Sequence, residues 1–181
     1  MKKNVGNLRI NCSKFMWLTS LAIFFVLAIS PFKLNAQDTK ANFAGTWAIN
    51  ATKSNQGDGN SRAARQLTVK QEGNNLTVDR LRANRDGVES IATDKFTLDG
   101  KEIVNTSNRG TSKSVATWSA DGKTLTIATT RSFDRNGTVT EMKSYETWSR
   151  TDATTLTIIS ISPSQNGERK VSLVYDQILT K

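Results

Sequence analysis

Tight-turn signals recur every 10 to 15 residues along most of the chain and divide it into short segments. Asn-Gly and Asp-Gly favour hairpin loops because both residues tolerate positive φ. The segments between the turns are rich in β-branched and aromatic residues and often alternate apolar with polar positions. The strongest helical pattern is a single turn at 61–65. The signals lie at 72–75, 85–87, 99–100, 109–110, 121–122, 136–137, 151–152 and 166–167.

This pattern predicts an all-β domain of about ten strands. Successive tight hairpins make an antiparallel up-and-down meander, and closure into a barrel of eight to ten strands removes exposed edges. A repeated Leu-Thr-Val/Ile triplet, at 76–78, 125–127 and 156–158, agrees with one hairpin built several times. The predicted strands are 45–50, 66–71, 75–83, 88–97, 102–107, 112–119, 123–133, 138–149, 154–162 and 168–178.

The first 36 residues have a different composition from the rest of the chain. They carry five basic residues and no acid, and 15–29 is an apolar run broken only by Thr19 and Ser20. A basic start, a short apolar core and a small residue near the end, Ala36, are typical of a secretory signal peptide. At about 1.5 Å per residue the run is shorter than the roughly 30 Å hydrocarbon core, which favours cleavage over a membrane anchor. We expect a signal peptide (1–36), a short linker (37–44) and a barrel domain (45–181).

Charge and composition narrow the function classes. The chain has 25 Lys and Arg against 16 Asp and Glu, and without the first 36 residues the basic count falls to 20. These charges are interspersed, so the sequence predicts no nucleic-acid partner. With no His, one Cys and no common catalytic, phosphate-binding or metal-binding spacing, we expect no enzyme, no metal and no cofactor.

The turn at 136–137 fixes which side chains share a face. With a two-residue loop, Phe133 opposes Thr140, and Arg131 opposes Met142. Further along, Ile127 opposes Glu146, and Leu125 opposes Trp148. This face is the more apolar one, so it should point into the barrel although it carries Arg131 and Glu146. The same rule at 166–167 puts Leu156, Ile158 and Ser160 beside Gln177, Tyr175 and Leu173, so Tyr175 should also face inward.

A charged side chain in the interior needs a partner, water or a ligand, because burying it alone costs several kcal/mol. In a structural interpretation, Arg131 and Glu146 pair with each other or lie at the solvated mouth of the barrel. In a functional interpretation, Arg131 with Arg80 and Tyr175 holds an acidic head group, while Trp148, Met142 and Phe133 hold an apolar tail. Arg80 is in phase with Leu76 and Val78, unless a bulge replaces it with Leu81. The candidate ligand-binding residues are thus Arg80, Arg131, Phe133, Met142, Glu146, Trp148 and Tyr175.

The segment Phe43-Ala44-Gly45-Thr46-Trp47 resembles the F-x-G-x-W opening of the first strand in lipocalins and related fatty-acid-binding barrels. In that motif the glycine bends the strand and the tryptophan closes one end of the barrel. The resemblance implies a lipocalin-like barrel, as in exported bacterial lipocalin-like domains, with Gly45 and Trp47 in these structural roles. The connection 51–64 is too short for the two-helix lid of fatty-acid-binding proteins, but it could cover the mouth as a flap.

Together these observations favour an exported barrel, periplasmic or secreted, that binds a small, partly apolar molecule noncovalently in its interior. One alternative is an interaction module with a solid core, an exposed aromatic patch near Tyr145 and no cavity above roughly 300 Å³. Another is an enzyme that pairs carboxylates in the barrel mouth, with candidates Asp79, Asp94, Glu141 and Glu146. A barrel inserted in an outer membrane is the weakest alternative, because the predicted outward faces are polar.

Overall fold

The computed structural model describes residues 40–56, 63–84, 86–107, 110–135, 137–165 and 167–179. The expected signal peptide lies outside these residues, as do 61–62 of the expected helical turn and 57–62 of the expected flap. Among the described residues, no helix is long and apolar enough to cross a membrane.

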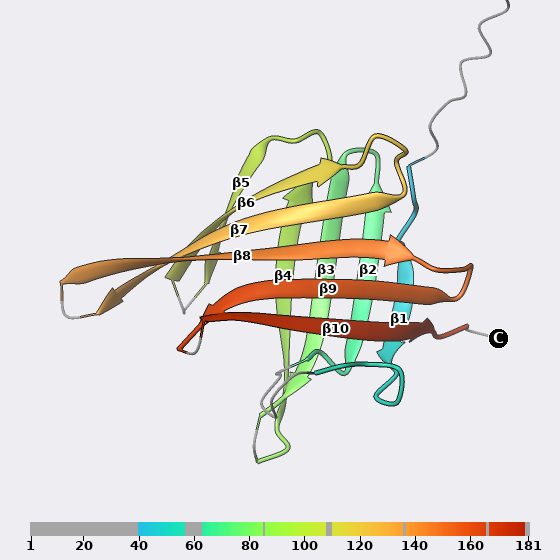
Figure 1. Ribbon diagram of the computed structural model, residues 1–181, viewed down its shortest axis with the longest axis horizontal. Coiled ribbons are helices and arrows are strands. Elements are labelled where there is room, and N and C mark those ends of the chain that lie inside the picture. The colour runs from blue at the N-terminus through green and yellow to red at the C-terminus, as the bar shows by residue number, and fades with distance from the viewer. Residues whose placement is uncertain are drawn as a thin grey trace, which may run out of the picture. The chain divides into compact units, whose positions relative to one another are not determined.

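The described part of the chain is all-β, as predicted, and contains ten strands whose ends differ from the predicted ones by no more than two residues. All neighbouring strands pair antiparallel in the order β4-β3-β2-β1-β10-β9-β8-β7-β6-β5. This order is an up-and-down meander in which β1 joins the last strand, and the sheet curls into a nearly closed barrel (Figure 1). The strands are β1 (Gly45–Ile49), β2 (Gln66–Glu72), β3 (Asn75–Ala83), β4 (Glu89–Thr97), β5 (Glu102–Ser107), β6 (Gly110–Trp118), β7 (Thr124–Arg135), β8 (Thr138–Arg150), β9 (Thr155–Ser164) and β10 (Gly167–Gln177).

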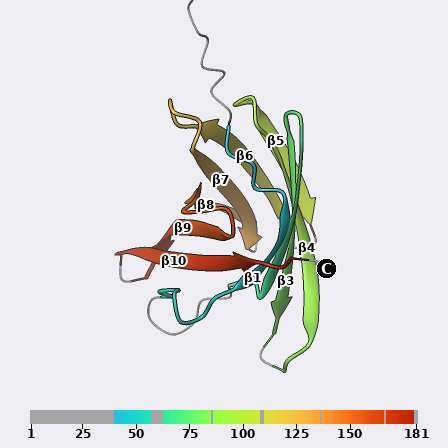
Figure 2. The ribbon, with the colours of Figure 1, turned by 90° about the vertical axis from the view of Figure 1, so that its right-hand side faces the viewer.

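The barrel has a seam between β4 and β5, the two ends of the strand order (Figure 2). No backbone ladder joins these two strands in the described residues. Instead, the side-chain amide of Asn105 spans the seam. Its Nδ2 donates to Lys95 O (2.9 Å), and its Oδ1 accepts from Lys95 N (3.2 Å). One side chain thus replaces a pair of ladder hydrogen bonds where the barrel closes.

The predicted registers hold for β7–β8 and shift for β9–β10. Arg131 opposes Met142, and Ile127 opposes Glu146, as the loop at 136–137 requires. In the other hairpin Gly167 pairs with Ser164, so Leu156 opposes Tyr175 rather than Gln177. The shift is an even one, so Tyr175 still faces inward and is 1% exposed. No bulge displaces Arg80, which alternates in phase with Leu76 and Val78.

One end of the barrel is closed by packed aromatic side chains. Trp47 is fully buried, and its indole N–H donates to Phe43 O (2.9 Å). Phe43 stacks on Trp118 and meets Trp148 edge-on, with centroids 5.8 Å apart in both pairs. The guanidinium of Arg150 lies 5.5 Å from the centre of the Trp47 ring. Residues 40–44, expected as a linker, therefore contribute a core side chain to this end.

The backbone at Gly45 agrees with the role that the motif implies. Its φ is 140°, in the region that favours glycine, and a Cβ there would lie 2.9 Å from Gln177 Nε2. The first strand can therefore bend against β10 without a clash.

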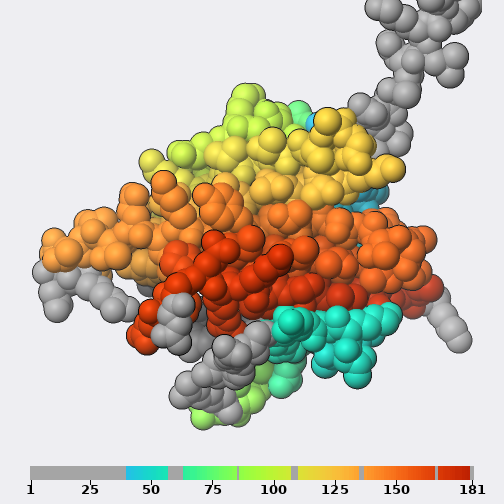
Figure 3. All heavy atoms as spheres, viewed as in Figure 1, coloured from blue at the N-terminus to red at the C-terminus, as the bar shows by residue number. Residues whose placement is uncertain are grey.

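The β7–β8 hairpin extends beyond its neighbours. β8 pairs with β9 only over Tyr145–Arg150, and β7 pairs with β6 only up to Ser132. The remaining length forms a two-stranded arm that projects from the barrel wall (Figure 3).

Candidate ligand-binding cavity

The inward-facing positions change from apolar to polar at one level along the strands. On β9, Leu156 and Ile158 are followed by Ser160 and Ser162. On β3, Leu76 and Val78 are followed by Arg80. β6 repeats this change from Ala116 to Ser114 and Ser112, whereas β10 keeps Leu173 and Val171 at the levels of Ile158 and Ser160. We call the packed level the closed half and the polar level the open half. The closed half contains Phe43, Trp47, Leu67, Val69, Leu76, Val78, Leu125, Trp148, Leu156 and Ile158, each at most 3% exposed.

Arg80 lies at the boundary between the two halves. Its Nε is 2.9 Å from Asp94 Oδ2 on the neighbouring strand β4, and its terminal NH2 nitrogen is 2.8 Å from Glu146 Oε2 on β8. β3 and β8 are separated by four strands in the sheet order, so this ion pair crosses the interior. The guanidinium carbon also lies 5.7 Å from the centre of the Trp148 ring, whose indole N–H donates to the same Glu146 oxygen (2.9 Å).

The boundary cluster, formed by Arg80, Asp94, Glu146 and Trp148, stabilises the charged forms of Arg80 and Glu146. Burial alone would lower the pKa of Arg80, but the carboxylates of Glu146 and Asp94 outweigh it and raise that pKa. Burial would likewise raise the pKa of Glu146, but Arg80 and the Trp148 indole outweigh it and lower that pKa. Burial raises the pKa of Tyr175 to about 12, so its hydroxyl stays protonated. Arg80 and Glu146 are therefore both ionised at neutral pH.

Above this boundary the open half encloses a cavity of about 1350 Å³. Its apolar lining comes from few large side chains: Ile49, Ile91, Phe96, Ile127 and Met142. Hydroxyl groups are more numerous. They belong to Ser90, Ser112, Ser114, Thr129, Ser144, Ser160 and Ser162. Four arginines and three carboxylates complete the charged lining: Arg65, Arg80, Arg82, Arg131, Asp86, Asp94 and Glu146.

The arginines of the lining differ in how they are held. Arg80 forms ion pairs with two carboxylates, and Arg65 forms one with Glu89, with 3.5 Å between Nη1 and Oε1. Arg82 follows Arg80 on the same face of β3, where burial and the neighbouring Arg80 cation lower its pKa. Arg131 is exposed and forms no ion pair or hydrogen bond within the described part of the chain. Arg131 is thus the lining cation whose charge is most available to a bound molecule.

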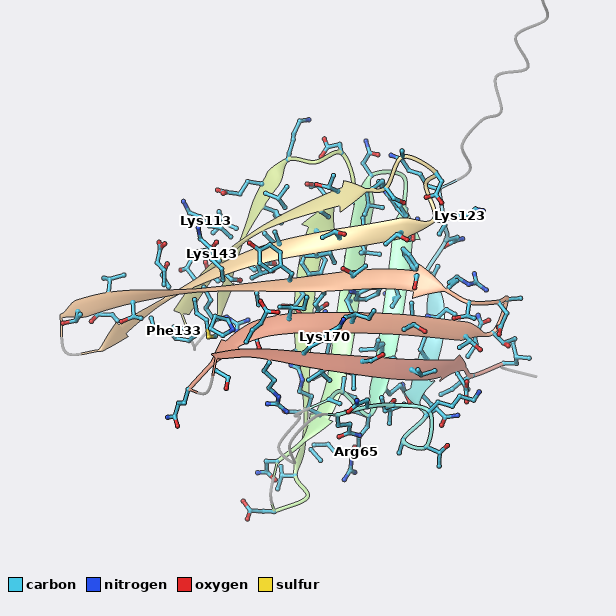
Figure 4. All side chains as sticks on the ribbon, viewed as in Figure 1. Arg65, Lys113, Lys123, Phe133, Lys143 and Lys170 are labelled. Atoms are coloured by element: carbon cyan, nitrogen blue, oxygen red, sulfur yellow. The ribbon has the colours of Figure 1, made fainter. Side chains whose placement is uncertain are left out.

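The structure brings together some of the predicted site residues and separates others. Arg80, Arg131, Met142 and Glu146 line the cavity. Tyr175 lines an adjoining pocket of about 170 Å³, which shares Arg80, Glu146 and two serines with the cavity. Trp148 is fully buried below the cluster rather than in the lining. Phe133 lies on the projecting arm, outside the lining residues (Figure 4).

Of the two forms of the structural interpretation, the pairing of Arg131 with Glu146 is wrong. Glu146 pairs with Arg80, because the curled sheet brings β3 and β8 face to face across the interior. Sequence reasoning also left Asp94 among scattered acids, although it lies diagonal to Arg80 across the β3–β4 ladder. Once Arg80 is placed inward, that ladder register is the signal that could have identified Asp94 as its partner.

The same geometry contradicts the solid core of the interaction-module alternative. A cavity of about 1350 Å³ exceeds the limit of roughly 300 Å³ expected of a solid core, although Tyr145 is exposed on the outer face as expected. For an enzyme we expected two close carboxyls with perturbed pKa values. Asp94 and Glu146 both contact the Arg80 cation, and the pKa of Glu146 is lowered, so this carboxylate is ionised at neutral pH. No cluster of three or more metal-ligating side chains occurs among the described residues.

The sequence matches no protein-family model and no curated protein. Among solved structures, the chain is similar to zebrafish ileal bile acid-binding protein, crystallised in complex with cholic acid. The TM-score is 0.50 and the identity 16%, over 75% of this chain and 98% of that one. This likeness confirms the predicted fold, an antiparallel barrel of the lipocalin-like, or calycin, type.

Proposed function

We propose that this protein binds a small molecule with an acidic group, noncovalently, in the open half of its barrel. The observation that carries the proposal is the open cavity of about 1350 Å³ with Arg131 in its wall. A guanidinium without a protein counter-ion is a ready partner for a carboxylate, sulfonate or phosphate.

Two further features support this function. Most of the buried hydrophobic core lies outside the cavity lining, so the fold does not depend on filling the cavity with side chains. The bile acid-binding protein that shares this fold was crystallised with an amphipathic acid. In this chain the apolar contribution would come from Ile127 and Met142 of the lining, and not from the tail site of Trp148, Met142 and Phe133 expected from the sequence.

We also propose that the protein acts outside the cytoplasm, in the periplasm or as a secreted protein. The support is the basic start, apolar run and small-residue end within residues 1–36. Cell fractionation followed by N-terminal sequencing of the purified protein tests this. A mature chain starting near residue 37 is the expected result, and an intact N-terminus in the cytoplasm would contradict it.

A matched pair of fluorescent probes tests the binding function. 1-Anilinonaphthalene-8-sulfonate and N-phenyl-1-naphthylamine share an aromatic frame, but only the first carries an anionic group. We expect the sulfonate to bind the folded protein, and the variant Arg131→Gln to weaken it about tenfold, as for one charge-assisted contact. The uncharged probe should be insensitive to this substitution.

Lys143→Gln is the control variant, because Lys143 is an exposed cation at an outward position of the same hairpin (Figure 4). If both variants weaken the sulfonate equally, the effect is general electrostatics and Arg131 is not a binding residue. If the sulfonate does not bind at all, the proposed function is wrong.

A further inference from the structure

The wall of the cavity is rich in hydroxyl groups, in contrast to the apolar wall that a hydrocarbon chain requires. Its serines come from four different strands, β4, β6, β8 and β9. Each lies at an inward position that a leucine or valine could occupy, as Leu156 and Ile158 do lower on β9. The polar wall therefore extends over several strands rather than one.

The serine hydroxyls of one side of the wall are not consumed by the protein. Ser144, Ser160 and Ser162 make no side-chain hydrogen bond within the described residues, and none of their oxygens is both fully buried and unpartnered. These hydroxyls are therefore available to a molecule in the cavity. A contrast is Ser114, 1% exposed, whose hydroxyl lies 2.9 Å from that of Thr129.

A serine hydroxyl both donates and accepts hydrogen bonds, and its short side chain leaves space for a ligand atom. Several such groups around one cavity match a molecule with several hydroxyls of its own. An alkyl chain in the same place would leave these groups without partners once water is displaced, which penalises it. The lining thus discriminates against a simple fatty acid, although the cavity is large enough to hold one.

Extending the proposed function, on which this inference rests, we propose that the ligand is a polyhydroxylated anion of the sugar-acid type. Its hydroxyls bind the serine wall formed by Ser144, Ser160 and Ser162, and its acidic group binds Arg131. Short apolar parts of the ligand lie against Ile127 and Met142, which line the same cavity.

Three octyl compounds test separately the role of the ligand hydroxyls and the role of the acidic group. Octyl β-D-glucuronide carries both the hydroxyls and the acid, octyl β-D-glucoside carries the hydroxyls alone, and octanoate carries the acid alone. Isothermal titration calorimetry below their micelle concentrations should show the glucuronide binding at least tenfold more tightly than either relative. Equal or tighter binding of octanoate would overturn the role of the hydroxyls, and equal binding of the glucoside would overturn the role of the acid.

The triple variant S144A/S160A/S162A tests the wall itself. We expect it to weaken the glucuronide about tenfold or more and to leave octanoate unchanged or tighter. The control is T126A/T147A/S149A, which removes three hydroxyls at outward positions of β7 and β8 and should change neither affinity. An unchanged glucuronide affinity in the first variant would overturn the inference.

The two proposals fail in different ways. If the naphthalene sulfonate binds through Arg131 but no octyl compound prefers the wild-type wall, the ligand class is wrong and the proposed function stands. If neither the sulfonate nor any octyl compound binds, the proposed function fails, and this inference fails with it.

Discussion

β9 passes through both halves of the interior, and its inward residues differ between them. Leu156 and Ile158 are at most 1% exposed in the closed half, whereas Ser160 and Ser162 line the cavity. In the closed half, aliphatic and aromatic side chains fill the space and stabilise the fold by burial. In the open half, the same strand carries short polar side chains that leave space unfilled.

This comparison indicates a division along the strands: the closed half stabilises the fold, and the open half is where we propose that the ligand binds. Residues that only line a cavity contribute little to stability, so polar and charged side chains can occupy the open half without a large cost to the free energy of unfolding. Arg80, with its two carboxylates, forms the boundary. If the division is real, stability and binding should respond to substitutions at different levels of the same strands.

Leu156→Ala and Ser160→Ala test this division on one face of one strand. Leu156 is fully buried, so its truncation should lower the free energy of unfolding by about 3–4 kcal/mol through lost burial and a cavity. Ser160 faces the cavity, and its truncation should change that energy by no more than about 0.5 kcal/mol. Urea denaturation measures both. Similar losses in the two variants would show that the halves are not energetically distinct.

Arg80→Met tests the boundary itself. The substitution leaves Asp94 and Glu146 facing the interior without their shared cation, so we expect a loss of about 3 kcal/mol in unfolding free energy. The value is at the low end for a buried pair, because the carboxylates are 32% and 27% exposed. Arg131→Met, at a lining position without an ion pair in the described residues, is the control and should change stability little. A loss below about 1 kcal/mol in Arg80→Met would mean that the cluster does not hold the two sides of the barrel together.

Acid titration gives a further test of the boundary. Because the folded state lowers the pKa of Glu146, its contribution is present above the unfolded pKa of about 4.5 and is lost as pH falls through the lower folded value. We expect Glu146→Gln to cost about 2 kcal/mol at pH 7 through lost charge-assisted hydrogen bonds. The difference from wild type should shrink as the pH is lowered from 5 to 3. Urea denaturation across this range measures it, and Ser160→Ala should keep the wild-type pH dependence. A constant difference would contradict the lowered pKa.

Most of the fold was predictable because its determinants are local. Turn dipeptides located the hairpins, and alternation then set which face of each strand points inward. The β9–β10 register was predicted wrongly because Gly167 begins a strand instead of completing the turn. The resulting shift is even, so the inward face was still correct and Tyr175 was placed on it.

The site was only partly predictable, because its decisive contact is not local. Arg80 and Glu146 are 66 residues apart and lie on strands that are not neighbours. Hairpin registers give each residue its neighbours within the sheet, but not the residue opposite across the barrel. For the same reason, the inward direction of Trp148 was predicted correctly, but its position was not. Trp148 lies in the closed half, below the cavity, and the hairpin register alone does not show which end of the barrel is closed. The apolar-to-polar change along β3, β6 and β9 was the signal that could have supplied that depth.

A substitution at the seam between β4 and β5 should have the smallest effect on the free energy of unfolding. Asn105→Ala removes two hydrogen bonds that join β4 to β5 at an exposed position, so we expect a loss of about 1 kcal/mol. Hydrogen exchange at the Lys95 amide should accelerate, while amides of the closed half keep their protection. Asn105→Asp retains an acceptor for Lys95 N but lacks the donor to Lys95 O. Its exchange rate at the Lys95 amide should fall between those of the wild type and Asn105→Ala. If Asn105→Ala instead lowers protection throughout the closed half, the barrel opens as one unit, and the independence of its two halves is lost.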